Sequence, residues 1–275
     1  MSAPESTTPE SGAPAAPLRD AATVVLVRDG SDGIEVFLQR RVKQMAFAGG
    51  MTVFPGGGVD ARDAEADLAW SGPGAPWWAD AFNTTEETAQ ALVCAAVRET
   101  FEECGVLLAT GAEGEVVDPA ALSAERAQLV DKSLSLAEFL RARSLTLRAD
   151  LLAPLAHWIT PVNEKRRYDT RFFLAAVPHG QHPDDATTEA EVALWAGARA
   201  ALTSWRDGKH FLLPPTWAQL TEIARFDCVD DLLAADHRIE PIQPDVTPGA
   251  GLARLSFPSS DRYFEALGDQ RTPEL

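Results

Sequence analysis

Three glutamates near the middle of the chain have the type and spacing to bind a metal ion. Glu99, Glu102 and Glu103 stand at positions i, i+3 and i+4, which a helix places on one face. Like charges at this spacing repel by roughly 0.2–0.5 kcal/mol per pair, and a hard divalent cation such as Mg²⁺ would reverse that sign. Arg98, four residues before Glu102, is placed to hold that carboxylate. The alternative is a solvated acidic helix face.

A glycine-rich segment precedes this helix. Residues 53–60 read Val-Phe-Pro-Gly-Gly-Gly-Val-Asp. Glycine lets the backbone approach a ligand closely and adopt positive φ, so carbonyl and N–H groups of this segment can reach a metal ion or a phosphate. Three consecutive glycines are also typical of a flexible turn, which is the alternative interpretation.

Taken together, the two segments resemble the box of the Nudix hydrolases, G-x5-E-x7-R-E-U-x-E-E-x-G-U, in which U is apolar. Gly57 corresponds to the first glycine, and residues 98–106 match the second half, with Thr100 at a normally apolar position. Gly57 and Arg98 are farther apart than the box allows. The sequence is therefore similar to a branch with an insertion inside the box, that of the peroxisomal coenzyme A diphosphatases of animals and their bacterial relatives.

The first glutamate of the box has no clear counterpart. Counted back from Arg98, its position falls on Gln90, and Glu86 and Glu87 lie nearby. The role of the first glutamate of the box therefore stays unassigned. Because this glutamate is mainly structural in the family, Gln90 does not indicate an inactive protein.

A segment upstream partly matches a pattern associated with coenzyme A hydrolysis in this family, L-L-T-x-R-S-x3-R-x3-G-x3-F-P-G-G. Arg41 and Gly50 fall on their positions, and Ala46 replaces the second arginine. The resemblance implies that Arg41 and Gly57 contact a coenzyme A substrate. For Arg41, a solvated strand end is the alternative.

Further charged residues downstream lie in a segment that also looks like this branch. Guanidinium groups bind phosphates in a bidentate way, which suggests substrate binding by Arg166, Arg167 and Arg171. A later carboxylate often joins the metal site in this family. Candidates without an anchoring motif, for which surface charge is the alternative, are Glu164, Glu189 and Glu191.

The resemblance implies metal-dependent hydrolysis of a pyrophosphate bond. Glu99, Glu102 and Glu103, with the backbone carbonyl of Gly56, would bind Mg²⁺ or Mn²⁺, and these glutamates and Arg98 would form the catalytic set. The substrate would be a nucleoside diphosphate linked to another group, with coenzyme A or an acyl-coenzyme A favoured. Alternatives are hydrolysis of ADP-ribose, NADH or dinucleoside polyphosphates, a non-catalytic nucleotide-sensing Nudix module, and an interaction protein whose acidic helix binds a partner.

The elements that position these residues follow from the patterning. Two β-branched runs around a turn at residues 29–33 predict a hairpin over 21–39. Residues 85–104 predict a helix that begins after Thr84 or Thr85 and ends at Gly105. Further strands are expected over 155–159, 171–177 and 191–195, mostly helix over 115–156, and another helix over 216–225. We expect an α/β fold, a Nudix-like α/β/α sandwich with a mixed sheet and helical insertions.

The expected organisation has three parts. Residues 1–19 are rich in Pro, Ser, Thr, Ala and Gly, which is typical of a disordered tail. Residues 20–205 form the Nudix domain, with insertions at about 60–84 and 112–150. Residues 206–275 form a C-terminal helix and an irregular extension packed on the same domain. In the first insertion, Trp70, Trp77 and Trp78 are expected to pack the insertion against the domain. The alternatives are that they cover a pocket or form a dimer contact.

Composition excludes several classes of protein. With 275 residues, 24 basic and 41 acidic, the net charge is −17, and such a surface repels nucleic acids. No run suggests a membrane span or a secretory signal, and the three cysteines and five histidines show no metal-ligand spacing. We expect a cytoplasmic enzyme whose partner is a small nucleotide. Many members of the family are dimers, so a homodimer is one of the oligomeric states that the resemblance allows.

Overall fold

One mixed β-sheet forms the centre of the computed structural model, which describes residues 15–42, 50–65, 67–184, 186, 190–237, 239–246 and 255–268. The strands run in the order β10–β2–β1–β9–β8–β11, with β3 paired to β2 and β4 paired to β1. These strands are β1 (Leu18–Gly30), β2 (Gly33–Arg41), β3 (Thr52–Val53), β4 (Gly56–Gly58), β8 (Ala153–Ile159), β9 (Arg167–Ala176), β10 (Ala190–Gly197) and β11 (Pro241–Ile242).

The central strand β1 has partners of both orientations. It pairs antiparallel with β2, where Gly30 lies opposite Gly33, and parallel with β9, from Leu18 opposite Arg167 onwards. Alternate residues of β1 enter different cores because side chains of a strand point to opposite faces. Val24 belongs to one buried cluster and Val25 to the other.

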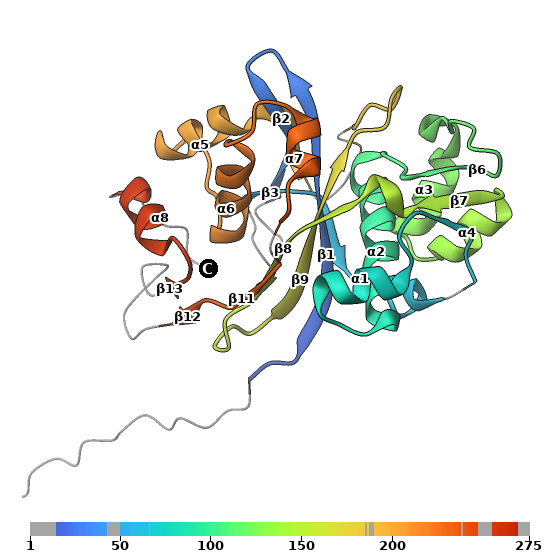
Figure 1. Ribbon diagram of the computed structural model, residues 1–275, viewed down its shortest axis with the longest axis horizontal. Coiled ribbons are helices and arrows are strands. Elements are labelled where there is room, and N and C mark those ends of the chain that lie inside the picture. The colour runs from blue at the N-terminus through green and yellow to red at the C-terminus, as the bar shows by residue number, and fades with distance from the viewer. Residues whose placement is uncertain are drawn as a thin grey trace, which may run out of the picture.

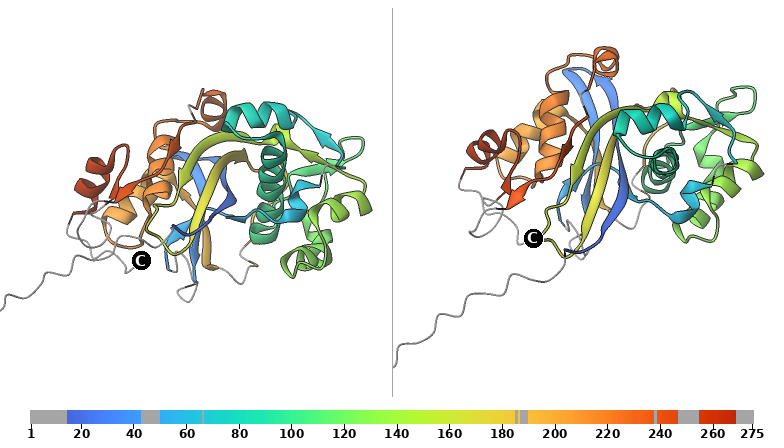
Figure 2. Two further views of the ribbon diagram at one scale, coloured as in Figure 1. Left: turned by 90° about the horizontal axis from the view of Figure 1, so that it is seen from below. Right: turned by 60° about the horizontal axis from the view of Figure 1, so that its bottom comes forward.

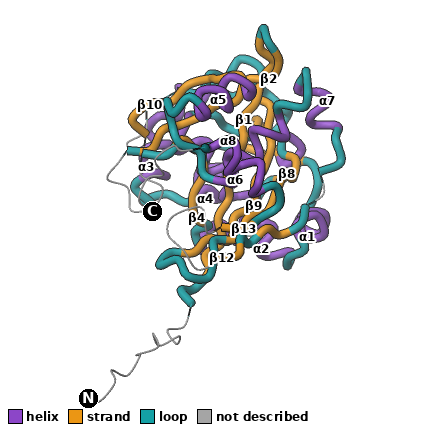
Figure 3. Tube along the Cα trace, turned by 90° about the vertical axis from the view of Figure 1, so that its left-hand side faces the viewer, coloured by secondary structure: helices purple, strands orange, loops and turns teal. Residues whose placement is uncertain are grey.

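Helices cover both faces of this sheet (Figure 1). On one side lie α1 (Ala75–Phe82), α2 (Glu86–Cys104), α3 (Ser123–Val130) and α4 (Leu136–Ala142). On the other lie α5 (Ala198–Arg206), α6 (Pro214–Ile223), α7 (Val229–Ala234) and α8 (Ser260–Leu267). The views from other directions show the same three layers (Figure 2), and α5, α6 and α8 lie over the strands when seen from their own side (Figure 3). The predicted α/β/α sandwich with a mixed sheet is confirmed.

The helix α2 carries the glutamates and is buried along almost its whole length. Thr85 caps its N-terminus, accepting the N–H of Thr88 at 3.1 Å, and Gly105 ends it in the left-handed region with φ 70°. The sheet covers one face of α2, while α1, α3 and the 3₁₀ turn η1 (Ala61–Ala64) cover others. Small residues such as Ala95 and Ala96 allow these close approaches.

Segments from the two predicted insertions meet in a second, three-stranded sheet. Its order is β5 (Trp70–Ser71), β7 (Leu145–Arg148) and β6 (Ala109–Gly111). The strand β7 lies within a stretch predicted to be mostly helical, because its pairing to β5 and β6 outweighs the local pattern. Trp78 is fully buried and packs near Phe82 and Phe173, whereas Trp77 is 49% exposed. Trp78 therefore holds the first insertion on the sheet.

The C-terminal region contains more regular structure than predicted. The helices α5, α7 and α8 and the short strands β12 (Asp245–Val246) and β13 (Leu255–Ser256) were not expected. Two further 3₁₀ turns, η2 (Pro119–Leu122) and η3 (Ala149–Leu151), lie in the second insertion. The predicted tail falls largely on residues 1–14, outside the described residues, while β1 already begins at Leu18. The three-part division of the chain stays a prediction. The helices of the described residues include none long and apolar enough to cross a membrane.

Candidate active site

The last turns of α2 lie against β4, the glycine strand. Glu103 is 6% exposed, and its Oε2 accepts the N–H of Gly56 at 3.0 Å. Glu99 is 9% exposed, and its carboxylate lies so close to Gly57 that a Cβ atom there would come within 2.5 Å of Oε1. The structure thus brings the predicted glutamates and the glycine segment together at one end of the sheet.

Arg98 organises the carboxylates of this region. Its Nη1 donates to Glu99 Oε1 at 2.7 Å and to Glu102 Oε1 at 3.1 Å, and its Nη2 donates to the Gly58 carbonyl at 2.9 Å. Burial alone would lower the pKa of the guanidinium, but the surrounding carboxylates outweigh burial and raise it. Arg98 is therefore a charged positioning residue, joining α2 to β4.

A further acidic residue, Asp63, completes this cluster. Its side chain is 2% exposed and accepts from Arg98 Nη2 at 2.9 Å and from Nε at 3.0 Å. Asp63 stands six residues after Gly57, which is the place of the first acidic residue of the box. Counting back from Arg98 to Gln90 stays inside α2 and never reaches the far side of the insertion, so that count fails. Gln90 instead donates to the Glu65 carbonyl at 2.9 Å. Counting forward from Gly57 would have found Asp63.

These carboxylates carry more negative charge than Arg98 compensates. Burial raises the pKa of Glu99 to about 7, and although Arg98 lowers it, Glu102 and Asp63 raise it further. Burial also raises the pKa of Glu102. A second cation would relieve this excess, and carboxylate oxygens are the ligands that Mg²⁺ and Mn²⁺ prefer.

The donor chemistry therefore fits a hard divalent cation. In the described part of the chain, no three acidic, His or Cys side chains already surround one point closely enough to hold a metal. The oxygens of these glutamates are instead bonded to Arg98 and to the Gly56 N–H.

The close approach at Gly57 leads to a test. Replacing Gly57 by alanine is expected to lower the catalytic rate at least about tenfold, because the new Cβ would displace the Glu99 carboxylate, and a displacement of about 1 Å can cost 100-fold. Steady-state kinetics measures the effect. The control is Gly74→Ala, whose Cβ would meet only Pro76 Cδ at 3.6 Å. Equal rates in the two variants would contradict a catalytic role for the Glu99–Gly57 contact.

The predicted substrate-binding arginines have different environments. Arg167 is 7% exposed and donates to the carbonyls of Pro161 and Ala16 at 3.1 and 3.3 Å. Arg171 is 5% exposed and contacts Asp169 at 2.7 Å and Asp20 at 3.2 Å. A buried guanidinium needs such compensation, and these carbonyls and carboxylates supply it. The role of Arg167 and Arg171 as phosphate ligands stays a prediction.

Two other predicted arginines lie nearer to solvent. Arg166 is exposed in the loop between β8 and β9. Arg41 is partly exposed at the end of β2, and its backbone forms hydrogen bonds with the Met51 carbonyl and the Gly50 N–H, each of 3.0 Å. Both positions are compatible with contact to a ligand.

The later carboxylates give no clear fourth metal ligand. Glu164 is exposed, and Glu189 lies outside the described residues. Glu191 lies 3.8 Å from Arg40 Nε. None of these positions is brought to Gly56 by a contact that the structure shows in the described residues.

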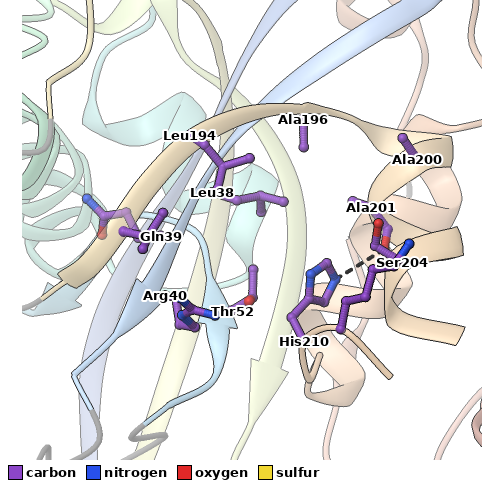
Figure 4. A pocket seen from close by; sticks show the side chains of 12 residues that line it. Leu38, Gln39, Arg40, Thr52, Leu194, Ala196, Ala200, Ala201, Ser204 and His210 are labelled. Atoms are coloured by element: carbon purple, nitrogen blue, oxygen red, sulfur yellow. Dashed lines mark hydrogen bonds between the residues drawn. The ribbon is translucent and has the colours of Figure 1, made fainter. Parts of the chain in front are cut away.

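A pocket of about 200 Å³ lies on the other face of the sheet, between β2, β10 and α5 (Figure 4). His210 Nε2 donates a 3.1 Å hydrogen bond to the carbonyl of Ala201 beside it. The side chains around this pocket include Leu38, Arg40, Thr52, Leu194 and Ser204. Since none of the three glutamates lines it, this pocket is separate from the candidate active site.

Comparison with known families agrees with this geometry. Residues 75–226, more than half of the chain, match the model described as the NUDT19 Nudix domain. The chain belongs to the Nudix hydrolase family. As a Nudix hydrolase it is a pyrophosphohydrolase, and members of this family generally use divalent metal ions.

Known proteins similar to this Nudix hydrolase include one solved structure with substantial overlap. A NUDIX hydrolase from Alicyclobacillus acidocaldarius is 33% identical, with a TM-score of 0.71, over 81% of this chain and 98% of its own. Two curated relatives are named acyl-coenzyme A diphosphatase NUDT19. The Gallus gallus protein is 27% identical over 93% of this chain and 80% of its own length, and the Homo sapiens protein is 27% identical over 74% and 64%.

Proposed function

We propose that this Nudix hydrolase cleaves the pyrophosphate bond of coenzyme A or of an acyl-coenzyme A, with Mg²⁺ or Mn²⁺ as cofactor. The observation that carries the proposal is the convergence of Glu99, Glu102 and Glu103 beside the glycine strand, with one arginine among them. An excess of buried negative charge at the edge of a sheet is suited to a cation that in turn holds a pyrophosphate.

The proposed ligands of the cation are the carboxylates of Glu99, Glu102 and Glu103 and the backbone carbonyl of Gly56. When bound, a divalent cation neutralises charge on the pyrophosphate and lowers the pKa of a coordinated water. Arg98 fixes the side chains of Glu99 and Glu102 through its hydrogen bonds, and the Gly56 N–H fixes that of Glu103. These contacts hold the three carboxylates beside the glycine strand before substrate arrives. Since the described side chains do not yet surround one point, binding of the cation requires them to turn toward it.

The substrate class is supported by sequence and by relatives. Arg41 and Gly50 occupy positions of the coenzyme A pattern, at the end of β2 and just before β3. Two relatives over most of this chain are named acyl-coenzyme A diphosphatase. In the proposed reaction a water oxygen attacks one pyrophosphate phosphorus, the bridging P–O bond breaks, and coenzyme A yields 3′,5′-ADP and phosphopantetheine. Arg41 and Arg166 are proposed to bind substrate phosphates.

The test is a mass-spectrometric screen of products with Mg²⁺, with Mn²⁺ and with a chelator. The substrates are coenzyme A, acetyl-coenzyme A, ADP-ribose, NADH and diadenosine polyphosphates. Metal-dependent release of 3′,5′-ADP and the matching phosphopantetheine is the expected result. Cleavage confined to the other compounds would overturn the coenzyme A assignment, and undiminished activity with the chelator would overturn the metal site.

A further inference from the structure

The end of α2 is held by groups from four separate parts of the chain. A helix leaves its last four carbonyls without partners in the helix. Here the Phe101 carbonyl accepts the N–H of Gly105 at 3.0 Å, and that of Cys104 accepts the N–H of Asp184 at 2.9 Å. The remaining two carbonyls are those of Glu102 and Glu103, whose side chains are proposed metal ligands. The Glu103 carbonyl accepts from Gln39 Nε2 at 3.3 Å, and the Glu102 carbonyl accepts from Arg126 Nε at 3.1 Å.

Arg126 connects three segments through one side chain. It belongs to α3, in the second insertion, and its side chain is 13% exposed. Besides the Glu102 carbonyl, it contacts both oxygens of Asp184, through Nη1 at 2.7 Å and Nη2 at 2.9 Å. Burial would raise the pKa of Asp184, but the hydrogen bonds and charge of Arg126, together with the N–H of Ala186, outweigh burial and lower it. The pair is thus a charged, bidentate contact, which is stronger than a neutral one.

The glycine that ends α2 makes room for this contact. A Cβ atom at Gly105 would lie 2.7 Å from Asp184 Oδ2 and 2.9 Å from Arg126 Nη1. The last turn of α2 contains no basic residue of its own. Arg126 therefore supplies, from another element, the positive charge that favours a helix C-terminus.

We propose that Arg126 is a positioning residue that fixes the turn of α2 bearing Glu102 and Glu103 and so sets the affinity of this turn for the divalent cation. The insertion then has a defined function, since Arg126 of α3 and Asp184 both contact the last turn of α2. The inference rests on the proposed role of these glutamates as metal ligands.

The expected size of the effect follows from what Arg126 does. Loss of a group that orients metal ligands typically weakens metal binding or activity by about 10- to 100-fold. Lysine cannot replace the arginine fully, because a single ammonium cannot reach the Glu102 carbonyl and both oxygens of Asp184 in this fork geometry. Arg126→Met keeps the apolar stem and removes all three hydrogen bonds, whereas Asp184→Asn keeps the Arg126–Glu102 contact and weakens only the charge pair.

The experiment measures Mn²⁺ affinity by electron paramagnetic resonance, amide hydrogen exchange over residues 102–106 without metal, and kcat and KM. For Arg126→Met we expect Mn²⁺ binding weaker by about 10- to 100-fold, faster exchange in this turn, and a fall in kcat larger than any rise in KM. Asp184→Asn should show a smaller loss in the same direction. The matched control is Arg143→Met, which removes an ion pair with Glu125 inside the same insertion, with Nε and Oε1 at 2.7 Å.

The outcomes separate this inference from the proposed function. Wild-type protein that binds no Mn²⁺ would overturn the proposed metal site. Wild-type Mn²⁺ affinity in folded Arg126→Met, or an equal loss in Arg143→Met, would overturn the positioning role. Should Arg126→Met not fold, unchanged affinity and exchange in Asp184→Asn and Arg126→Lys together would overturn it as well.

Discussion

Glu103→Gln is expected to lower turnover by at least about 100-fold, the effect of losing a key electrostatic group in an active site, while the fold survives. Glutamine has the shape of glutamate, and its amide oxygen can still accept the Gly56 N–H that Glu103 Oε2 accepts at 3.0 Å. What disappears is one negative charge beside β4, and in the proposed function this charge helps to hold the cation. Steady-state turnover with Mg²⁺ and with Mn²⁺ measures the loss, and circular dichroism and thermal unfolding check the fold.

The matched control for this variant lies on the same helix. Glu87 is exposed in the first turn of α2, so Glu87→Gln changes the net charge equally without touching the glycine strand and should retain full turnover. Near-normal turnover in folded Glu103→Gln would refute the assignment of this glutamate to the metal site. A loss of similar size in both variants would point to long-range charge rather than to a bound cation.

Arg98→Met is expected to destabilise the protein by about 3–5 kcal/mol, the usual cost of removing one partner from a buried ionic cluster. The side chains of Asp63, Glu99 and Glu102 are only 2%, 12% and 14% exposed. Without the guanidinium they would be buried without the cation to which all three are hydrogen-bonded, and methionine offers no hydrogen bond in exchange. Urea unfolding gives the change in the free energy of unfolding.

An exposed pair supplies the comparison for Arg98. Arg225 is 71% exposed and contacts Glu222 at 2.8 Å, and such surface pairs contribute roughly 0–1 kcal/mol. Arg225→Met should therefore leave the free energy of unfolding nearly unchanged. If the two variants lost stability equally, the cluster around Arg98 would not be the buried, mutually dependent unit that its contacts describe.

Elements with strong local signals were predicted well from the sequence. The hairpin of β1 and β2 follows from β-branched runs around a glycine turn, and α2 follows from its cap at Thr85 and its stop at Gly105. The strand β7 and the helix α8 are short, and their stability depends on neighbours. For example, Tyr263 of α8 is fully buried, and its ring stacks on that of Trp205 of α5. No local sequence pattern predicts this contact.

The candidate site was predicted in its core and missed at its edges. Residue types and spacing identified the three glutamates and the glycine strand, because both belong to one box. Asp63 was missed because the count started from the far side of an insertion. Arg126 was missed because it lies in an element whose packing on α2 depends on the fold. The partners of the buried arginines of β9 could not be predicted either. Arg171 contacts Asp20 and Asp169, and Arg167 donates to backbone carbonyls, and both sets of contacts depend on the fold.

The parallel pairing of β1 with β9 has a consequence for the order of folding. Asp20 and Arg171, which contact each other across these strands, are 151 residues apart in the sequence. The first hairpin and β4 can pair as soon as they emerge from the ribosome, but the sheet closes only after both insertions have been made. Long loops of this kind slow folding. During synthesis one edge of β1 therefore stays unpaired until β9 emerges from the ribosome. Slowing translation after β9 has emerged should change the yield of folded enzyme little, whereas slowing it before then should prolong the exposure of that edge.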